Sequence, residues 1–202
     1  MADGGQILEG SGFLLRPWRP GDAESLAANA DNRNVWTNLR SRFPRPYTVA
    51  VARVWISRCV GGRERGLQLA IDVDGLAVGG ISVDMVTANT PRTGEIGYWI
   101  GEPYWGRGIA GAAVRMACPV AYERLALDRL RAVVRSSNVA SLRILERSGF
   151  LVQSRMRRSD RRPGSAVVEM VYTRDRDGFS APGPPLAVAT VLNGLAHSYL
   201  MR

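Results

Sequence analysis

The stretch that decides the fold reads Gly94-Glu95-Ile96-Gly97-Tyr98-Trp99-Ile100-Gly101 and then, two residues later, Tyr104-Trp105-Gly106-Arg107-Gly108-Ile109-Ala110-Gly111. Its first half is apolar and aromatic, which indicates a strand, and its glycine-rich turn leads into a helix. Glycine lets backbone N–H groups approach a ligand closely, and the first turn of a helix presents unsatisfied N–H groups and a positive dipole end. This order of strand, turn and helix predicts a binding site for a phosphate-bearing ligand.

Length and composition indicate one globular domain of ordinary type. The chain has 202 residues, of which 46% are hydrophobic and 22% charged. Its apolar runs are shorter than the roughly 18 residues that a membrane span needs, and residues 1–5 lack the features of a signal peptide. Cys59 and Cys118 are far apart and outside any metal-ligand spacing. We therefore expect a cytoplasmic protein with reduced thiols, no metal and no membrane partner.

The formal net charge of +9 raises the question of nucleic-acid binding. Every basic residue is Arg and none is Lys, which we attribute to codon bias in a GC-rich genome. The arginines are dispersed along the chain, apart from residues 155–158 and 161–162, and no stacking aromatic pattern accompanies them. The expected partners therefore include no specific nucleic acid, although the charge can favour an anionic cofactor or an acidic protein.

Apolar periodicity and turn signals divide the rest of the chain into strands and helices. Strands are expected at residues 13–18, 67–73, 77–86, 93–100, 130–134, 150–157 and 166–174. Helices are expected at residues 23–30, within 32–46, from 49 to 60, from 109 onward and at 138–148. This order predicts an α+β fold with a mixed central sheet of about seven strands, flanked by helices.

Several local signals carry expectations of their own. Asp22 and Thr48 are predicted to cap the helices that follow them. Pro119 falls inside the helix after the glycine turn, where a proline costs ~3 kcal/mol, so we expect a bend or a break there. The helix after Thr48 is expected to turn one set of helically spaced residues inward, namely Val51, Val54, Trp55, Arg58 and Cys59.

The C-terminal region differs in character from the rest. Residues 1–177 make up the expected domain, residues 178–185 read as a Pro- and Gly-rich linker, and residues 186–202 form an apolar, helix-compatible tail. The tail is too short and too polar to cross a bilayer. It is predicted to pack on its own domain, a second subunit or a partner, or to be disordered, so both a monomer and a homodimer stay open.

Three motifs in this order resemble the GNAT acetyltransferases. They span residues 95–100, 104–110 and 138–150, and residues 14–23 fit the same family, so the resemblance covers about residues 12 to 175. The ribosomal-protein-alanine N-acetyltransferases are the branch the chain resembles most. The resemblance implies that acetyl-CoA lies in a V-shaped opening between two splayed parallel strands, here the one at residues 95–100 and the one at 130–134.

The resemblance also implies which residues bind the co-substrate. Pantetheine would pair with the backbone near Trp99, Ile100 and Gly101, much as an added strand would. The pyrophosphate would lie on the amides of the turn and first helical residues, namely Trp105, Gly106, Arg107, Gly108, Ile109, Ala110 and Gly111. Trp105 stands where the family has Gln or Arg. Asn138 resembles an asparagine that contacts the cofactor, and it also suits a helix N-cap.

Candidate catalytic residues follow from the same resemblance. Glu95 is the leading general base or amine-orienting carboxylate, with an arginine-paired strand carboxylate as its structural alternative. Ser141 resembles a serine placed as proton donor to the leaving thiolate, and it could equally be a polar residue of a first helical turn. Asp160 falls where the branch places a carboxylate base, with Asp84 as a weaker candidate. Trp36 is the best candidate for lining the acceptor cleft.

Three functions remain open from the sequence. The first is transfer of an acetyl group from acetyl-CoA to a protein N-terminal α-amine, by direct attack within a ternary complex and without an acyl-enzyme. The second is the same chemistry on a small molecule such as an aminoglycoside, a polyamine or an amino-acid-like amine. The third is a catalytically silent acyl-CoA-binding regulator or assembly module. Intact cofactor motifs together with Glu95 and Ser141 favour an enzyme.

Overall fold

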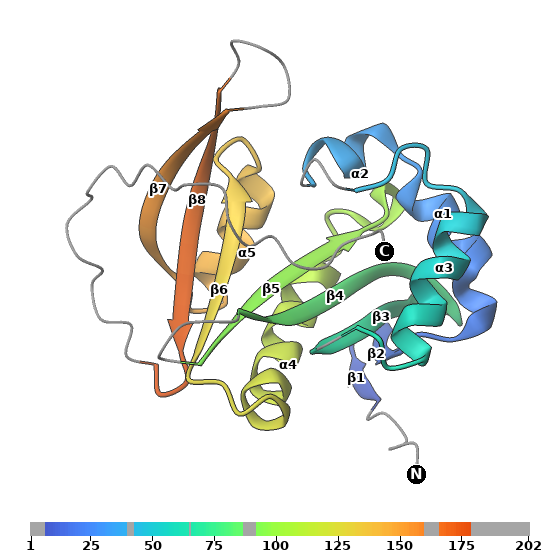
Figure 1. The fold of residues 1–202 in the computed structure, drawn as a ribbon, viewed down its shortest axis with the longest axis horizontal. Coiled ribbons are helices and arrows are strands. Elements are labelled where there is room, and N and C mark those ends of the chain that lie inside the picture. Colours follow the sequence, from blue (N-terminus) through green and yellow to red (C-terminus); the bar gives the residue numbers. More distant parts are fainter. Residues whose placement is uncertain (1–6, 40–42, 65, 87–91, 160–165, 179–202) are drawn as a thin grey trace.

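A single mixed sheet forms the centre of the molecule. The computed structural model describes residues 7–39, 43–64, 66–86, 92–159 and 166–178, and within them the sheet has eight strands in the order β1-β2-β3-β4-β5-β6-β8-β7 (Figure 1). The strands are β1 Leu8–Gly10, β2 Phe13–Pro17, β3 Leu67–Val73, β4 Leu76–Val86, β5 Thr93–Ile100, β6 Arg129–Arg135, β7 Leu151–Ser159 and β8 Ala166–Asp175. Only β5 and β6 pair in parallel; the other neighbours in the sheet are antiparallel. The predicted α+β class with a mixed sheet is confirmed.

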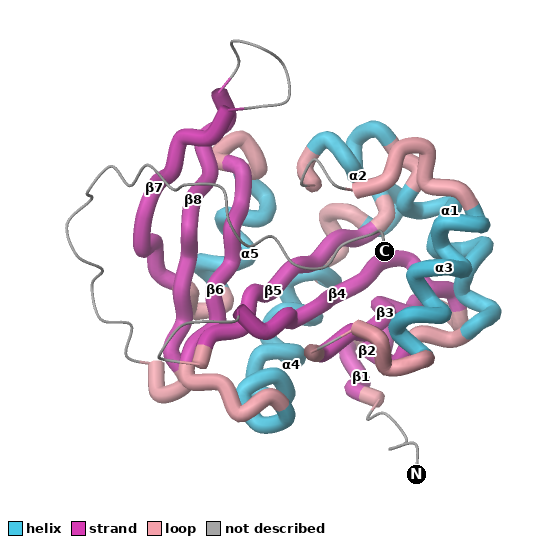
Figure 2. Tube along the Cα trace, viewed as in Figure 1, coloured by secondary structure: helices cyan, strands magenta, loops and turns pink. Residues whose placement is uncertain are grey.

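Helices cover both faces of the sheet (Figure 2). They are α1 Ala23–Ala30, α2 Arg33–Thr37, α3 Val49–Val60, α4 Ile109–Arg124 and α5 Val139–Arg147, with short 3-10 helices η1 Pro20–Asp22 and η2 Glu102–Tyr104. Side chains of α1 and α3 share one buried cluster with Trp18 and Ala70 on one face. Side chains of α4 and α5 share the larger cluster on the other face with Ile71 and Ile96. We call these the α1–α3 face and the α4–α5 face.

The sheet splits between β5 and β6. The two strands pair at three positions only, Thr93↔Arg129, Gly94↔Leu130 and Glu95↔Arg131. Beyond them β5 stays paired with β4 as far as Ile100, while β6 stays paired with β8 as far as Arg135. The facing edges therefore separate into a V with its apex at Glu95 and Arg131, and Figure 1 shows the two strands diverging from there. This is the splayed pair that the sequence motifs predict.

Two elements differ from expectation in extent. The sheet has eight strands rather than about seven, because residues 8–10 form β1 against β2, a three-residue edge strand too short to show alternation. Helix α4 also runs unbroken past Pro119, so the predicted break is absent. The helix is held on both sides of Pro119 by fully buried side chains, among them Val114, Ala117 and Ala121. Their burial offsets the hydrogen bond that proline cannot donate.

The two predicted caps have different outcomes. Thr48 caps α3 as expected, with its hydroxyl accepting from the Val51 N–H at 3.3 Å. Asp22 stands at the start of α1, but its side chain makes no cap bond to that helix. Its carboxylate instead accepts from the Arg16 guanidinium at 2.7 and 2.8 Å and from the Arg19 backbone N–H. A charge-assisted bond to a buried guanidinium is stronger than a neutral cap, which explains the change of partner.

The predicted inner face of α3 is wrong in part. Ala52 and Ile56 are the buried residues of this helix, and the predicted residues Val51, Trp55 and Cys59 are partly buried and pack on the same cluster, whereas Val54 is 53% exposed. The centre of the inner face is therefore shifted from the expected set toward Ala52 and Ile56. Small Ala52 allows close approach to α1, and spacing of apolar residues alone cannot show that.

Candidate active site

The V exposes a free strand edge on β5. The Gly101 N–H donates to the Val78 carbonyl at 2.8 Å. Because bonding alternates along an antiparallel pair, Trp99 and Gly101 turn their backbone groups toward β4, while Ile96, Tyr98 and Ile100 turn theirs into the V. An extended ligand could pair with these groups as an added strand. Of the three residues predicted to hold pantetheine, only Ile100 presents its backbone to the V, and Tyr98 joins it there.

The turn after β5 is shaped by glycines and by one tryptophan. Gly106 and Gly108 have positive φ of 75° and 76°, and Gly108 caps α4 from the left-handed region. The first intrahelical bond of α4 runs from the Ala112 N–H to the Gly108 carbonyl at 3.1 Å. The N–H groups of the three residues between them therefore have no acceptor within the helix, as an anion site requires.

Trp105 has a role of its own in this turn. Its indole N–H donates to the Ile100 carbonyl at 2.8 Å and so ties the turn back to the end of β5. The ring stays 43% exposed. This contact occupies one of the backbone acceptors that face the V. It also gives a physical reason why Trp can stand where the family has Gln or Arg, since the side chain fixes the turn rather than reaching outward. The Arg107 guanidinium lies over the Tyr104 ring, 5.4 Å from its centroid.

Ser141 and Asn138 lie at the start of α5. The Asn138 side chain accepts from the Ser141 N–H at 3.1 Å, so the predicted N-cap is confirmed. The Ser141 hydroxyl lies 2.7 Å from the hydroxyl of Tyr98, which extends from β5 on the α4–α5 face. Burial raises the pKa of Tyr98 well above its usual value, so this phenol stays protonated in neutral solution. The Tyr98 side chain therefore links β5 to α5 across the V on this face.

Glu95 lies at the apex of the V with its side chain on the opposite face. Residues 95 and 99 share a side of the strand, and Trp99 packs on the α1–α3 cluster. The Glu95 carboxylate accepts from Arg131, with contacts of 2.8 Å to Nε and 2.7 Å to a terminal guanidinium nitrogen. Asp84 is its cross-strand neighbour and accepts from the Gln68 amide at 2.8 Å. The structural alternative named for Glu95, an arginine pair, is thus present.

Helix α2 closes the α1–α3 side of the site. Trp36 lies on this helix with the Arg45 guanidinium over its ring, 4.2 Å from the centroid. The Arg135 guanidinium of β6 donates to the Thr37 carbonyl at 3.3 Å, which connects α2 to the far wall of the V. Trp36 is thus next in sequence to the residue whose carbonyl Arg135 contacts, and its role in the acceptor cleft stays a prediction. Asp160 and residues 179–202 lie outside the described residues.

A second link joins α2 to η2 after β5, and no sequence pattern predicts it. The Glu102 carboxylate of η2 accepts from the side-chain amides of Asn32 and Asn34, each at 2.8 Å. Asn32 is also the N-cap of α2 and accepts from the Asn34 and Val35 backbone N–H groups. The start of α2 is thereby fixed to the segment that follows β5. Asn and Glu in two polar loops, about 70 residues apart, carry no recognisable spacing.

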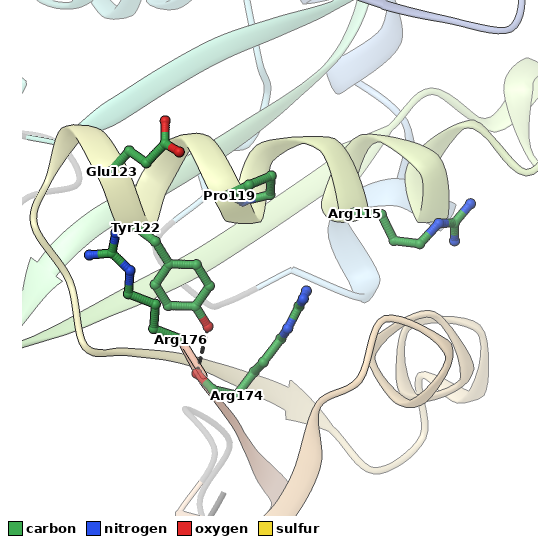
Figure 3. Close-up of a pocket in the computed structure, with 6 residues that line it drawn as sticks. All are labelled: Arg115, Pro119, Tyr122, Glu123, Arg174 and Arg176. Atoms are coloured by element: carbon green, nitrogen blue, oxygen red, sulfur yellow. Dashed lines mark hydrogen bonds between the residues drawn. The ribbon is translucent and has the colours of Figure 1, made fainter. Parts of the chain in front are cut away.

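A shallow groove of about 270 Å³ lies elsewhere, between α4 and the end of β8 (Figure 3). It is lined by Arg115, Pro119, Tyr122, Glu123, Arg174 and Arg176. The register pairs Arg174 with Leu130, next to the closed end of the V. Figure 3 shows the side chains of Arg115 and Arg176 at opposite ends of the groove, so the guanidinium groups do not converge on one point. The groove is separate from the candidate site.

Within the described part of the chain, no three or more His, Cys, Asp and Glu side chains are grouped so that they could hold a metal ion. The helices in that part of the chain are also too short or too polar to cross a membrane.

Comparison with known proteins identifies the family. The model of the acetyltransferase (GNAT) domain matches residues 13–151. YjcK of Bacillus subtilis, named a probable N-acetyltransferase, is 29% identical over 150 residues, which are 71% of this chain and 83% of YjcK. YdaF of the same organism has a name that assigns it provisionally to the ribosomal N-acetyltransferases. It is 35% identical over 92 residues, which are 46% of this chain and 50% of YdaF. RimJ of Mycobacterium smegmatis, solved with a CoA-disulfide, superposes with a TM-score of 0.70 at 24% identity, covering 84% of this chain and 85% of RimJ. With most of its length matched by the family model and its fold in agreement, the chain belongs to the GNAT family of acetyl-CoA-dependent N-acetyltransferases.

Proposed function

We propose that the protein transfers the acetyl group of acetyl-CoA to the N-terminal α-amine of a protein, by direct attack within a ternary complex. The observation that carries this proposal is the division of polar groups between the two faces of the V. Glu95 lies on the α1–α3 face and Ser141 on the α4–α5 face, with the free edge of β5 between them. Acetyl-CoA supplies the thioester, and two faces let amine and proton donor approach it from opposite sides.

The amine enters from the α1–α3 face in this proposal. An α-amine has a pKa near 8, so a modest base suffices to keep it neutral, whereas a Lys amine near 10.4 asks for more. Glu95 orients this amine and accepts its proton, directly or through one water. Arg131 holds the carboxylate in place through its two contacts. Glu95 and Tyr98 are three positions apart on the strand, about 10 Å, which leaves space for the amine and a water at the apex.

Protonation of the departing CoA thiolate is assigned to the α4–α5 face. Ser141 is the proposed proton donor to the CoA sulfur, with its backbone fixed by the Asn138 cap. The backbone groups of β5 that face the V and the first-turn N–H groups of α4 would hold pantetheine and pyrophosphate. No covalent enzyme intermediate is required, and both cysteines are kept as thiols because burial raises the pKa of Cys59 to about 12 and of Cys118 to about 11.

The choice of a protein N-terminus rests on the relatives and on the side chains around α2. YdaF is 35% identical over the matched segment and carries a ribosomal N-acetyltransferase name. Arg45 lies over the ring of Trp36 and Arg135 contacts the Thr37 carbonyl, so two guanidinium groups lie beside α2, which suits a polar or acidic peptide. A small-molecule acceptor and a silent acyl-CoA-binding module are the outcomes that would replace this proposal.

An acceptor panel tests it. Release of CoA thiol is measured with acetyl-CoA and peptides bearing free N-terminal Ala or Ser, the same peptides already Nα-acetylated, a polyamine and an aminoglycoside. We expect turnover with the free peptides only. Glu95→Gln should lower kcat about 100-fold with little change in acetyl-CoA affinity, while Glu24→Gln, an exposed carboxylate paired with Arg53, should leave kcat unchanged. Turnover confined to a small amine, or tight CoA binding without any turnover, would replace the proposal by one of its alternatives.

A further inference from the structure

The hydroxyl pair between β5 and α5 is the best-defined polar contact next to the V that the family resemblance does not explain. Tyr98 and Ser141 are 43 positions apart in sequence, and their hydroxyl oxygens lie 2.7 Å apart. The Tyr98 hydroxyl also lies 3.2 Å from the Ser141 carbonyl oxygen. Two arrangements of the protons satisfy this geometry, and they have opposite consequences for Ser141.

In one arrangement Tyr98 donates to the carbonyl oxygen and Ser141 donates to Tyr98. The 2.7 Å contact then uses the Ser141 hydrogen, and the Tyr98 hydrogen lies wholly in the contact of 3.2 Å, beyond the usual range of about 2.5–3.0 Å for such bonds. In the other, Tyr98 shares its single hydrogen between the Ser141 Oγ at 2.7 Å and the carbonyl oxygen at 3.2 Å, and the Ser141 hydrogen stays free. The 2.7 Å contact is common to both arrangements, so its length does not separate them. A phenol is a stronger acid than an aliphatic alcohol and is the better donor of the two, which favours Tyr98 as donor and Ser141 Oγ as acceptor.

We propose that Tyr98 is a positioning residue that fixes the direction of the Ser141 hydroxyl, by donating to its oxygen and leaving its hydrogen free to point into the V. The inference rests on the proposed role of Ser141 as proton donor. The Asn138 cap fixes the backbone of Ser141, and the partly buried Tyr98 side chain packs on the cluster of the α4–α5 face, so both partners of the pair are held.

The proton balance of the step is simple. When the C–S bond breaks, the sulfur takes the Ser141 hydrogen, and the proton released by the attacking amine on the other face returns through solvent to Ser141. Tyr98 keeps its own proton throughout, since its burial disfavours the phenolate. Tyr98 therefore acts through Ser141 and does not itself transfer a proton.

The arrangement predicts coupling between the two side chains. Ser141→Ala removes the donor and should lower kcat about 100-fold. Tyr98→Phe keeps the ring and removes one neutral hydrogen bond, so kcat should fall five- to tenfold with the acetyl-CoA KM within a factor of two. In the Ser141→Ala background, Tyr98→Phe should change kcat less than twofold, because the group that it orients is already gone.

The control variant is Tyr122→Phe. Tyr122 is another buried tyrosine whose hydroxyl donates at 2.7 Å, to the Arg174 carbonyl near the closed end of the V. The Tyr122→Phe protein should lose about as much stability as Tyr98→Phe and keep its kcat unchanged. Equal kcat for Tyr98→Phe and Tyr122→Phe, or equal effects of Tyr98→Phe in both Ser141 backgrounds, would overturn the inference.

The assay separates this inference from the proposed function. The four proteins of the cycle are measured first with the N-terminal alanine peptide. If the wild-type protein does not acetylate that peptide, the acceptor proposal fails, and the cycle is measured on slow hydrolysis of acetyl-CoA, where the same thiol departs. Full activity of Ser141→Ala in either assay overturns the serine role and the inference with it.

Discussion

Arg16 is the largest side chain that is fully buried in the described chain, and its removal has a calculable cost. It is 1% exposed and lies between two carboxylates, with Nε donating to Asp72 at 2.6 Å and the terminal nitrogens donating to Asp22 at 2.7 and 2.8 Å. These bonds join β2, β3 and the start of α1. The side chains of Asp22 and Asp72 are themselves only 6% and 4% exposed. Hydrogen bonds to the two carboxylates raise the pKa of Arg16, which keeps it charged.

Arg16→Met fills much of the same volume and leaves both carboxylates without a cation. Breaking a buried ion pair in this way costs about 3–5 kcal/mol, and here two carboxylates are affected at once. We therefore expect a loss of at least 4 kcal/mol, a large part of the 5–15 kcal/mol typical of a folded domain. With a urea slope of about 2 kcal/mol/M, the unfolding midpoint should fall by about 2 M.

The measurement is urea unfolding of the full chain at pH 7, followed by circular dichroism. The matched control is Arg53→Met, which breaks an exposed pair with Glu24 in which both side chains are more than 60% exposed, worth less than about 1 kcal/mol. A midpoint shift of Arg16→Met no larger than that of Arg53→Met would refute the reasoning.

Four further predictions test other parts of the site. Gly94→Ala should destabilise by 2 kcal/mol or more, since its Cβ would lie 2.6–2.7 Å from Leu127 and Val83, whereas Gly97→Ala on the same strand meets only Ser82 at 3.5 Å and should be tolerated in thermal melts. Glu102→Gln should raise the acceptor KM several-fold and leave the acetyl-CoA KM nearly unchanged in steady-state kinetics, because it weakens the link from η2 to α2. Trp105→Phe should do the reverse, weakening CoA binding measured by calorimetry, because the glycine turn is no longer tied to the Ile100 carbonyl at the end of β5. Burial raises the pKa of Cys118 from 9.0 to about 11, so unfolding releases a proton above pH 9; stability should fall between pH 9 and 11, and Cys118→Ala should flatten part of that fall in a pH series of melts.

Local periodicity was sufficient for most of the fold. The strands at residues 67–73 and 93–100 begin and end where the alternation predicts, and the capping signals at Thr48 and Asn138 are confirmed. Such features depend on neighbours within a few residues, which the sequence displays directly. The orientation of α3 and the continuity of α4 past Pro119 depend instead on what packs against each helix, and no local rule contains that information.

In the candidate site, too, the features formed within one short segment were predictable and the contacts between distant segments were not. The glycine turn and the helix start were predictable because backbone geometry depends on glycine positions in one short segment. The pairs Tyr98–Ser141 and Glu95–Arg131 join residues 43 and 36 positions apart, so they depend on the register of β5 with its neighbours. A shift of one residue would exchange the faces of the sheet, and the sequence alone does not fix the register.

The spacing of Glu95 and Tyr98 shows why that register matters for chemistry. Side chains alternate along a strand, so two residues separated by an odd number of positions lie on opposite faces. Glu95 and Tyr98 are three apart, and they meet Arg131 on one face and Ser141 on the other. Had the separation been two or four, the carboxylate and the hydroxyl pair would share a face, and the proposed base and proton donor could not approach the thioester from opposite sides. In the proposed mechanism, the odd spacing on β5, together with a V that leaves the edge of this strand open, lets one strand serve both sides of the acetyl transfer.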